Sequence, residues 1–178
     1  MLVITDAELL EQMQANDRQA FAILYEKYKT NIYRYCLRML ADGTSAEDAT
    51  HETFLKLFSH ARTLQNPHAL LAWLLSTARN EVMMMLRKDK RNGTMADNDV
   101  WMEQTPHDLI VASETTQLVQ TLIRQLKSEY REVLVLREYE HLSYYEIALI
   151  TGDTESSVKS RLFKARKALT EKLKSYYT

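Results

Sequence analysis

The sequence contains little glycine, proline or cysteine. Three glycines and two prolines in 178 residues leave few sites for tight turns, and the abundance of Ala, Leu, Glu and Lys favours helices. Cys36 is the single cysteine, which excludes an internal disulfide. No apolar run reaches the roughly 18 residues that a membrane span needs, and the first residues lack the basic and apolar pattern of a secretory signal. These absences predict an all-α, cytoplasmic protein without membrane insertion.

Residues suited to catalysis or metal binding are also sparse. The five histidines are dispersed along the chain. His51-Glu52 begins like a HExxH zinc motif, but Leu55 stands where the second histidine ligand would be. The sequence has no glycine-rich phosphate loop. We therefore expect a protein that is not an enzyme and that has no metal and no cofactor.

Charge is distributed unevenly, although the net charge is only −1. Residues 93–112 contain four acidic and no basic side chains, and no helical period runs through them. This segment is predicted to be a flexible acidic linker between two small helical domains, residues 1–92 and 113–178. By contrast, residues 154–174 contain seven basic and two acidic side chains, which is typical of a surface that meets nucleic acid.

Capping pairs and apolar periods predict where the helices lie. Thr5 with Glu8, and Ser143 with Glu146, have the spacing of a capping box. Asp42-Gly43 is expected to end one helix, and Thr44 to start the next. The predicted helices run near residues 5–15, 17–40, 45–62, 67–90, 114–126, 129–140, 143–150 and 154–175.

The segment LSYYEIALITGDTESSV fits a helix-turn-helix. Ala148 permits a close helix crossing, Gly152 supplies the turn, and Val158 returns to the core. On the second helix, the side opposite the apolar stripe is predicted to carry Ser156, Ser160, Phe163, Lys164 and Lys167, with Lys159 at its edge. Such a face suits phosphates, base edges and thymine methyl groups in the major groove. Alternatively, Phe163 packs on a neighbouring helix and the lysines are only solvated.

Two faces in the N-terminal half also suggest binding. Trp73, Asn80 and Arg87 recur at seven-residue steps, flanked by Thr77 and followed by the basic Lys88. An aromatic ring, an amide and a basic end suit the capture of unstacked bases, although a tryptophan at helical spacing also suits packing. A second face consists of Asp48, His51, Glu52 and Leu55. It suits a basic protein partner or is an ordinary solvated surface.

Both halves resemble the extracytoplasmic-function (ECF) sigma factors of bacterial RNA polymerase. The resemblance lies in AFAILYEKY, AEDATHETFLKLF and AWLLSTARN in the first half, and in REVLVLREYEHLSYYEIALITG and SVKSRLFKARKAL in the second. It implies a region 2-like domain at 1–92 and a region 4-like domain at 113–178. It also implies three partners, namely core RNA polymerase, promoter DNA (as a duplex and as the melted non-template strand) and an anti-sigma factor.

The resemblance assigns a role to each of the three faces. The face from Asp48 to Leu55 would dock on the polymerase. The minus-ten element would be melted and read by the loop 62–69 together with five residues of the following helix, namely Trp73, Thr77, Asn80, Arg87 and Lys88. A third set would read the minus-thirty-five element and consists of Ser156, Ser157, Lys159, Ser160, Phe163 and Lys164. The alternative function is a stand-alone helix-turn-helix regulator with a helical sensor domain, which would bind duplex DNA without polymerase.

Overall fold

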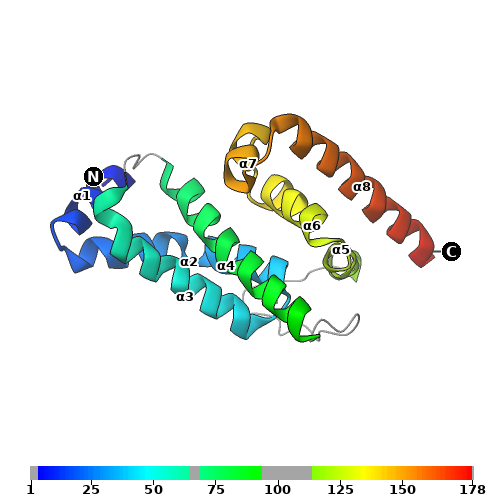
Figure 1. The fold of residues 1–178 in the computed structure, drawn as a ribbon, viewed down its shortest axis with the longest axis horizontal. Coiled ribbons are helices and arrows are strands. Elements are labelled where there is room, and N and C mark those ends of the chain that lie inside the picture. Colours follow the sequence, from blue (N-terminus) through cyan, green and yellow to red (C-terminus); the bar gives the residue numbers. More distant parts are fainter. Residues whose placement is uncertain (1–3, 65–68, 94–113, 178) are drawn as a thin grey trace. The chain divides into compact units, whose positions relative to one another are not determined.

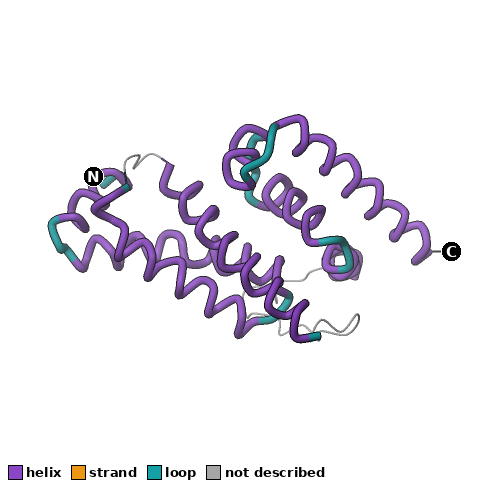
Figure 2. Tube along the Cα trace, in the orientation of Figure 1, coloured by secondary structure: helices purple, strands orange, loops and turns teal. Residues whose placement is uncertain are grey.

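The computed structural model describes residues 4–64, 69–93 and 114–177, and all regular structure in these ranges is helical (Figures 1 and 2). The predicted all-α class is therefore confirmed. The chain divides into two compact units, Met1–Asn98 and Asp99–Thr178, called here the N-terminal unit and the C-terminal unit. The predicted linker, residues 93–112, lies outside the described residues beyond Gly93 and stays a prediction.

In the N-terminal unit, three long helices pack around one apolar core. They are α2 (Arg18–Leu40), α3 (Gly43–His60) and α4 (Leu70–Asn92), and each contacts the other two. A short helix, α1 (Asp6–Gln14), lies against α2 and against the 3₁₀ turn η1 (Ala61–Thr63) that follows α3. The largest fully buried side chains of this core include Leu24, Ile32, Tyr35, Met39, Phe54, Leu57, Leu74 and Leu75.

Polar contacts fix α1 to the rest of the N-terminal unit. The carboxylate of Asp6 accepts hydrogen bonds from the Tyr28 hydroxyl and from the Lys27 ammonium group, the latter at 2.6 Å. At the other end of α1, the side-chain amide of Gln14 donates to the Ala61 carbonyl at 2.9 Å. The predicted capping box at the start of α1 is confirmed, because Thr5 and Glu8 bond to each other's backbone N–H.

The predicted junction between α2 and α3 is wrong in its details. Helix α2 ends at Leu40 and is capped by Ala41, which takes the left-handed conformation at φ 56°. Asp42 does not end that helix but caps the next one, because its carboxylate accepts the backbone N–H of Ser45 at 2.8 Å. Gly43 is therefore the first residue of α3. An aspartate satisfies an otherwise unpaired N–H at a helix start, and here it displaces Thr44 as the cap.

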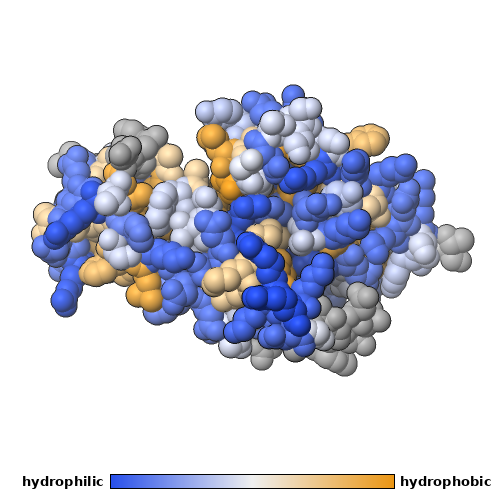
Figure 3. All heavy atoms as spheres, viewed as in Figure 1, coloured by the Kyte–Doolittle hydropathy of each residue, from blue (hydrophilic) through white to orange (hydrophobic). Residues whose placement is uncertain are grey.

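The C-terminal unit is built on α8 (Glu155–Tyr177), against which α5 (Glu114–Arg124), α6 (Ser128–Leu134) and α7 (Tyr144–Thr151) pack. The predicted helix 129–140 is α6 continued by a π-helical turn, η3 (Val135–Tyr139). The guanidinium of Arg131 lies within the unit and donates to the carbonyls of Arg124 and Leu126 at 2.5 and 3.1 Å. It thereby pairs backbone acceptors at the end of α5. Hydrophilic residues cover most of the surface visible in Figure 3.

Candidate functional site

The helix-turn-helix of the C-terminal unit consists of α7, a short turn and α8 (Figure 1). Ser143 and Glu146 form the predicted capping box at the start of α7, and the hydrogen bonds from Ser143 lower the pKa of Glu146. Gly152 ends α7 in the left-handed conformation at φ 73°, which a glycine adopts without strain. Val158 is completely buried, as predicted, so α8 is held against the core from its first turn.

The opposite side of α8 faces solvent. Phe163 is 71% exposed, and Ser156, Lys159, Ser160 and Lys164 are exposed beside it. Phe163 therefore does not pack on a neighbouring helix within this unit. Ser157 is half-buried, and its N–H donates to the Thr154 hydroxyl at 3.1 Å, which caps the helix start.

Other basic side chains near this face are bound within the unit. The guanidinium of Arg161 lies on the carboxylate of Asp153, and that of Arg166 lies 2.6 Å from Glu138. The ammonium of Lys159 lies 5.4 Å from the centre of the Tyr144 ring, within cation–π range. This contact directs Lys159 from the exposed face of α8 towards α7.

On α4, the predicted nucleic-acid residues differ in accessibility. Asn80, Arg87 and Lys88 are exposed, and Trp73 is half-buried. Thr77 is only 9% exposed, and its hydroxyl donates to the Trp73 carbonyl at 2.9 Å. Thr77 therefore faces the interior of the N-terminal unit, where little of its side chain is available to a base.

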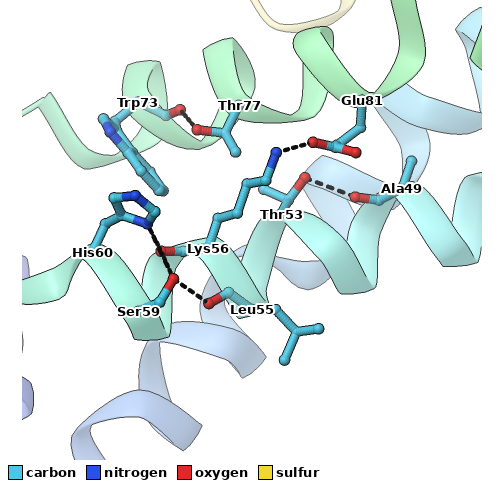
Figure 4. Close-up of polar contacts among 9 residues, drawn as sticks. All are labelled: Ala49, Thr53, Leu55, Lys56, Ser59, His60, Trp73, Thr77 and Glu81. Carbon is cyan, nitrogen blue, oxygen red and sulfur yellow. Dashed lines mark hydrogen bonds and ion pairs between the residues drawn. The ribbon is translucent and has the colours of Figure 1, made fainter. Parts of the chain in front are cut away.

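The sequence alone did not single out two residues of α3 that reach towards α4. Figure 4 shows the imidazole of His60 pointing towards the Trp73 indole, and Lys56 extending between α3 and α4 to pair with Glu81. His60 is exposed, and Glu81 is 4% exposed. The available signal was the four-residue spacing of Lys56 and His60, but their positions opposite Glu81 and Trp73 depend on how α3 packs on α4. The predicted loop 62–69 falls partly outside the described residues, at 65–68.

The acidic face of α3 is exposed throughout. Asp48, His51, Glu52 and Leu55 all face solvent, and Leu55 is 47% exposed. One turn further on, Phe58 is also exposed and extends the apolar end of this face, which sequence reasoning missed. The Phe58 ring meets Phe21 of α2 edge to face, with ring centroids 5.4 Å apart. The arrangement offers carboxylates and an apolar end side by side, as a basic protein partner with an apolar anchor would require.

The described residues contain no candidate metal centre. Among residues 4–64, 69–93 and 114–177, no three His, Cys, Asp or Glu side chains are grouped to hold a metal ion. Cys36 is fully buried in α2, and burial raises the pKa of its thiol to about 12. The same ranges contain no helix with both the length and the apolar character to cross a membrane.

Comparisons with known proteins match both units. The model of Sigma-70 region 2 matches residues 24–92, and that of Sigma-70, region 4 matches residues 116–169. The RNA polymerase sigma-H factor of Pseudomonas aeruginosa is 29% identical over 94% of this chain and 93% of its own length. The ECF RNA polymerase sigma factor SigW of Bacillus subtilis is 29% identical over 93% of this chain and 95% of its own length.

A solved structure agrees with these relatives. The sigma factor RpoE from Bartonella quintana, in a co-crystal with the anti-sigma factor NepR, superposes with a TM-score of 0.72 at 25% identity. The match covers 86% of this chain and 96% of that one.

An all-α chain in which a region 2 match precedes a helix-turn-helix with a region 4 match is a sigma-70-type transcription initiation factor. Within that class, the chain belongs to the extracytoplasmic-function (ECF) sigma factors. The predicted family and function are confirmed, and the stand-alone regulator is not favoured. The roles of individual residues remain predictions.

Proposed function

We propose that this sigma factor binds core RNA polymerase through α3 and reads promoter DNA through α4 and α8. The observation that carries the proposal is the exposed face of α8, where Phe163 lies in water among Ser156, Ser160 and Lys164. Exposing a large aromatic ring costs burial energy of about 1.5–3 kcal/mol, and the hydroxyls and lysines around it suit the edges and phosphates of a major groove. We assign this face, with Lys159 and Ser157, to the minus-thirty-five element.

The second DNA surface in this proposal is the exposed side of α4. Trp73 and Asn80 would hold unstacked bases of the minus-ten element, while Arg87 and Lys88 would contact phosphates. The imidazole of His60 points towards the Trp73 indole (Figure 4), which supports its inclusion in this surface, because a second ring widens the platform that a base can contact. Thr77 supports Trp73 through the backbone in this arrangement and is not a base contact.

The polymerase-binding surface is the face of α3 formed by Asp48, His51, Glu52 and Leu55. Its exposed carboxylates and apolar end support this assignment. We place the protein in the cytoplasm, where it acts with its polymerase and has no enzymatic activity of its own. The relative from Bartonella quintana is bound to an anti-sigma factor, which supports an anti-sigma factor as a further partner of this chain.

The test is co-elution of the purified protein with bacterial core RNA polymerase in gel filtration, which needs no knowledge of the promoter. The variant with Asp48→Lys and Glu52→Lys should lose most of the complex, since it reverses two charges on the docking face. A variant with Glu11→Lys and Glu26→Lys makes the same net charge change on exposed positions of α1 and α2, and it should co-elute like the wild type. DNA binding by the protein alone, without any polymerase complex, would instead establish the stand-alone regulator.

A further inference from the structure

One basic residue of α8 is bound inside the helix-turn-helix. The guanidinium of Arg161 contacts both carboxylate oxygens of Asp153, with nitrogen–oxygen distances of 2.5 and 3.1 Å. The two side chains are 28% and 22% exposed, so the pair is shielded from most of the solvent. A two-point contact between planar groups fixes relative orientation more firmly than a contact through a single lysine nitrogen.

Asp153 is anchored to the first helix of the motif. Its backbone N–H donates to the Ala148 carbonyl of α7 at 3.1 Å, and it directly follows Gly152 at the left-handed turn. Arg161 lies two turns into α8. The pair therefore connects the end of α7 to the body of α8 across the turn.

Arg161 also lies away from the exposed face. At roughly 100° per residue, it is about 160° around the helix from Phe163. Lys164 remains on the side of the helix that is open to a ligand, whereas Lys159 reaches towards Tyr144 of α7. Among the basic groups of α8, Lys164 thus faces outward, while Arg161 and Arg166 are bound within the unit.

We infer that the Asp153–Arg161 ion pair is a positioning element, which holds α8 at the angle required to enter the major groove without itself contacting DNA. The inference rests on the proposed function and deepens it, because it separates positioning residues from DNA contacts within one basic helix. The competing arrangement is that Arg161 turns to a phosphate on binding, in which case Asp153 only competes with the DNA for it. The two arrangements predict opposite changes in DNA affinity when the Asp153 charge is removed. Affinity should fall if the ion pair positions α8, and it should rise if Asp153 competes with the DNA for Arg161.

The experiment uses the full chain bound to core polymerase, with a fluorescent duplex whose upstream element was selected from a random library by the wild-type holoenzyme. Asp153→Asn should weaken binding roughly tenfold, within the range for residues in one network, even though it removes a negative charge near DNA. Arg161→Gln should weaken binding equally, and the double variant should be no weaker than either single variant. Arg161→Lys keeps the charge but not the two-point contact, and it should also bind less tightly.

Salt dependence separates positioning from phosphate contact. Lys164→Ala, the matched control, should reduce the slope of log affinity against log salt by about 0.9, whereas Arg161→Gln should leave it unchanged. The variants at Asp153 and Arg161 should also lose discrimination between the selected and a scrambled duplex. They should nevertheless retain their melting temperature and their co-elution with polymerase, which a variant with an unfolded α8 would not retain.

Tighter binding by Asp153→Asn, full affinity in Arg161→Lys, or a salt slope reduced by about one in Arg161→Gln would overturn the inference and leave the proposed function intact. A wild-type holoenzyme that selects no duplex would overturn the proposed function, and this inference with it.

Discussion

Replacing Lys56 with methionine should destabilise the N-terminal unit by about 2 kcal/mol. The side chain of Glu81 is 5% exposed, whereas that of its partner Lys56 is 43% exposed (Figure 4). Removing the ammonium leaves a buried carboxylate without its counter-charge, a change that costs about 3–5 kcal/mol in a fully buried pair. Because solvent reaches the lysine half of this pair and screens it, the expected loss is smaller.

The matched variant, Glu81→Gln, should cost less, about 1 kcal/mol. The glutamine keeps the volume and one oxygen that accepts a hydrogen bond, and the half-exposed ammonium of Lys56 can be hydrated when the carboxylate is lost. The double variant should be about as stable as Glu81→Gln alone, since no buried charge is then left unpaired. This asymmetry follows from the unequal burial of the two side chains.

Trp73 provides the assay, because it lies on α4 near the pair. In a Trp101→Phe background it is the only tryptophan, so urea unfolding followed by its fluorescence reports on the N-terminal unit. A loss in Lys56→Met no larger than that of Glu81→Gln would refute the reasoning.

Four further predictions concern single positions. Asn80→Ala should impair promoter opening more than initial binding, and unchanged permanganate reactivity of melted thymines would contradict this. Gly152→Ala should cost about 1–2 kcal/mol from left-handed strain alone, because a Cβ there meets nothing within 4 Å; urea unfolding followed by circular dichroism measures it, and Gly152→Asn should cost less. Burial raises the pKa of Cys36 to about 12, so alkylation at mildly alkaline pH should be slow in the native protein and rapid in urea; fast native labelling would show that the thiol is accessible. Hydrogen bonds from Ser143 lower the pKa of Glu146 below 4.5, so its contribution is present above that pH and is lost as pH falls through the lower, folded-state value; Glu146→Gln should flatten the acid dependence of melting, and an unchanged dependence would refute the assignment.

Helix boundaries were predictable where one local interaction decides them. Thr5 and Ser143 each form a capping box with a glutamate three residues on, within a single turn. The prediction failed at Asp42, where several capping candidates lie within three residues and the choice between them depends on how α2 and α3 pack. The π-helical turn Val135–Tyr139 was not predicted either. A turn of this kind changes the hydrogen-bond pattern without changing the apolar period that the sequence displays.

The sequence predicted which side of each helix is exposed, but not which ion pairs the side chains form. A period of 3.6 residues places Phe163 in water and Val158 in the core, and both positions are confirmed. The ion pair between Arg161 and Asp153 spans eight positions across a turn, and that between Lys56 and Glu81 joins two helices. Such pairs depend on tertiary geometry and on side-chain rotamers, which a helical period does not contain. For the same reason the inward position of Thr77 required the structure.

The helices α3 and α8 each have a buried side that stabilises their unit and an opposite side on which a large apolar residue is exposed. Each has one fully buried side, represented by Leu57 and Val158, and each leaves a large apolar side chain, Leu55 or Phe163, in water beside charges. Burying such a side chain is worth about 1.5–3 kcal/mol, and folding of the unit does not use that free energy. It therefore remains available for association with a partner. Because the stabilising side and the exposed side are separate, we expect substitutions on the exposed side to have little effect on the fold, and under the proposed function they should change partner or promoter preference.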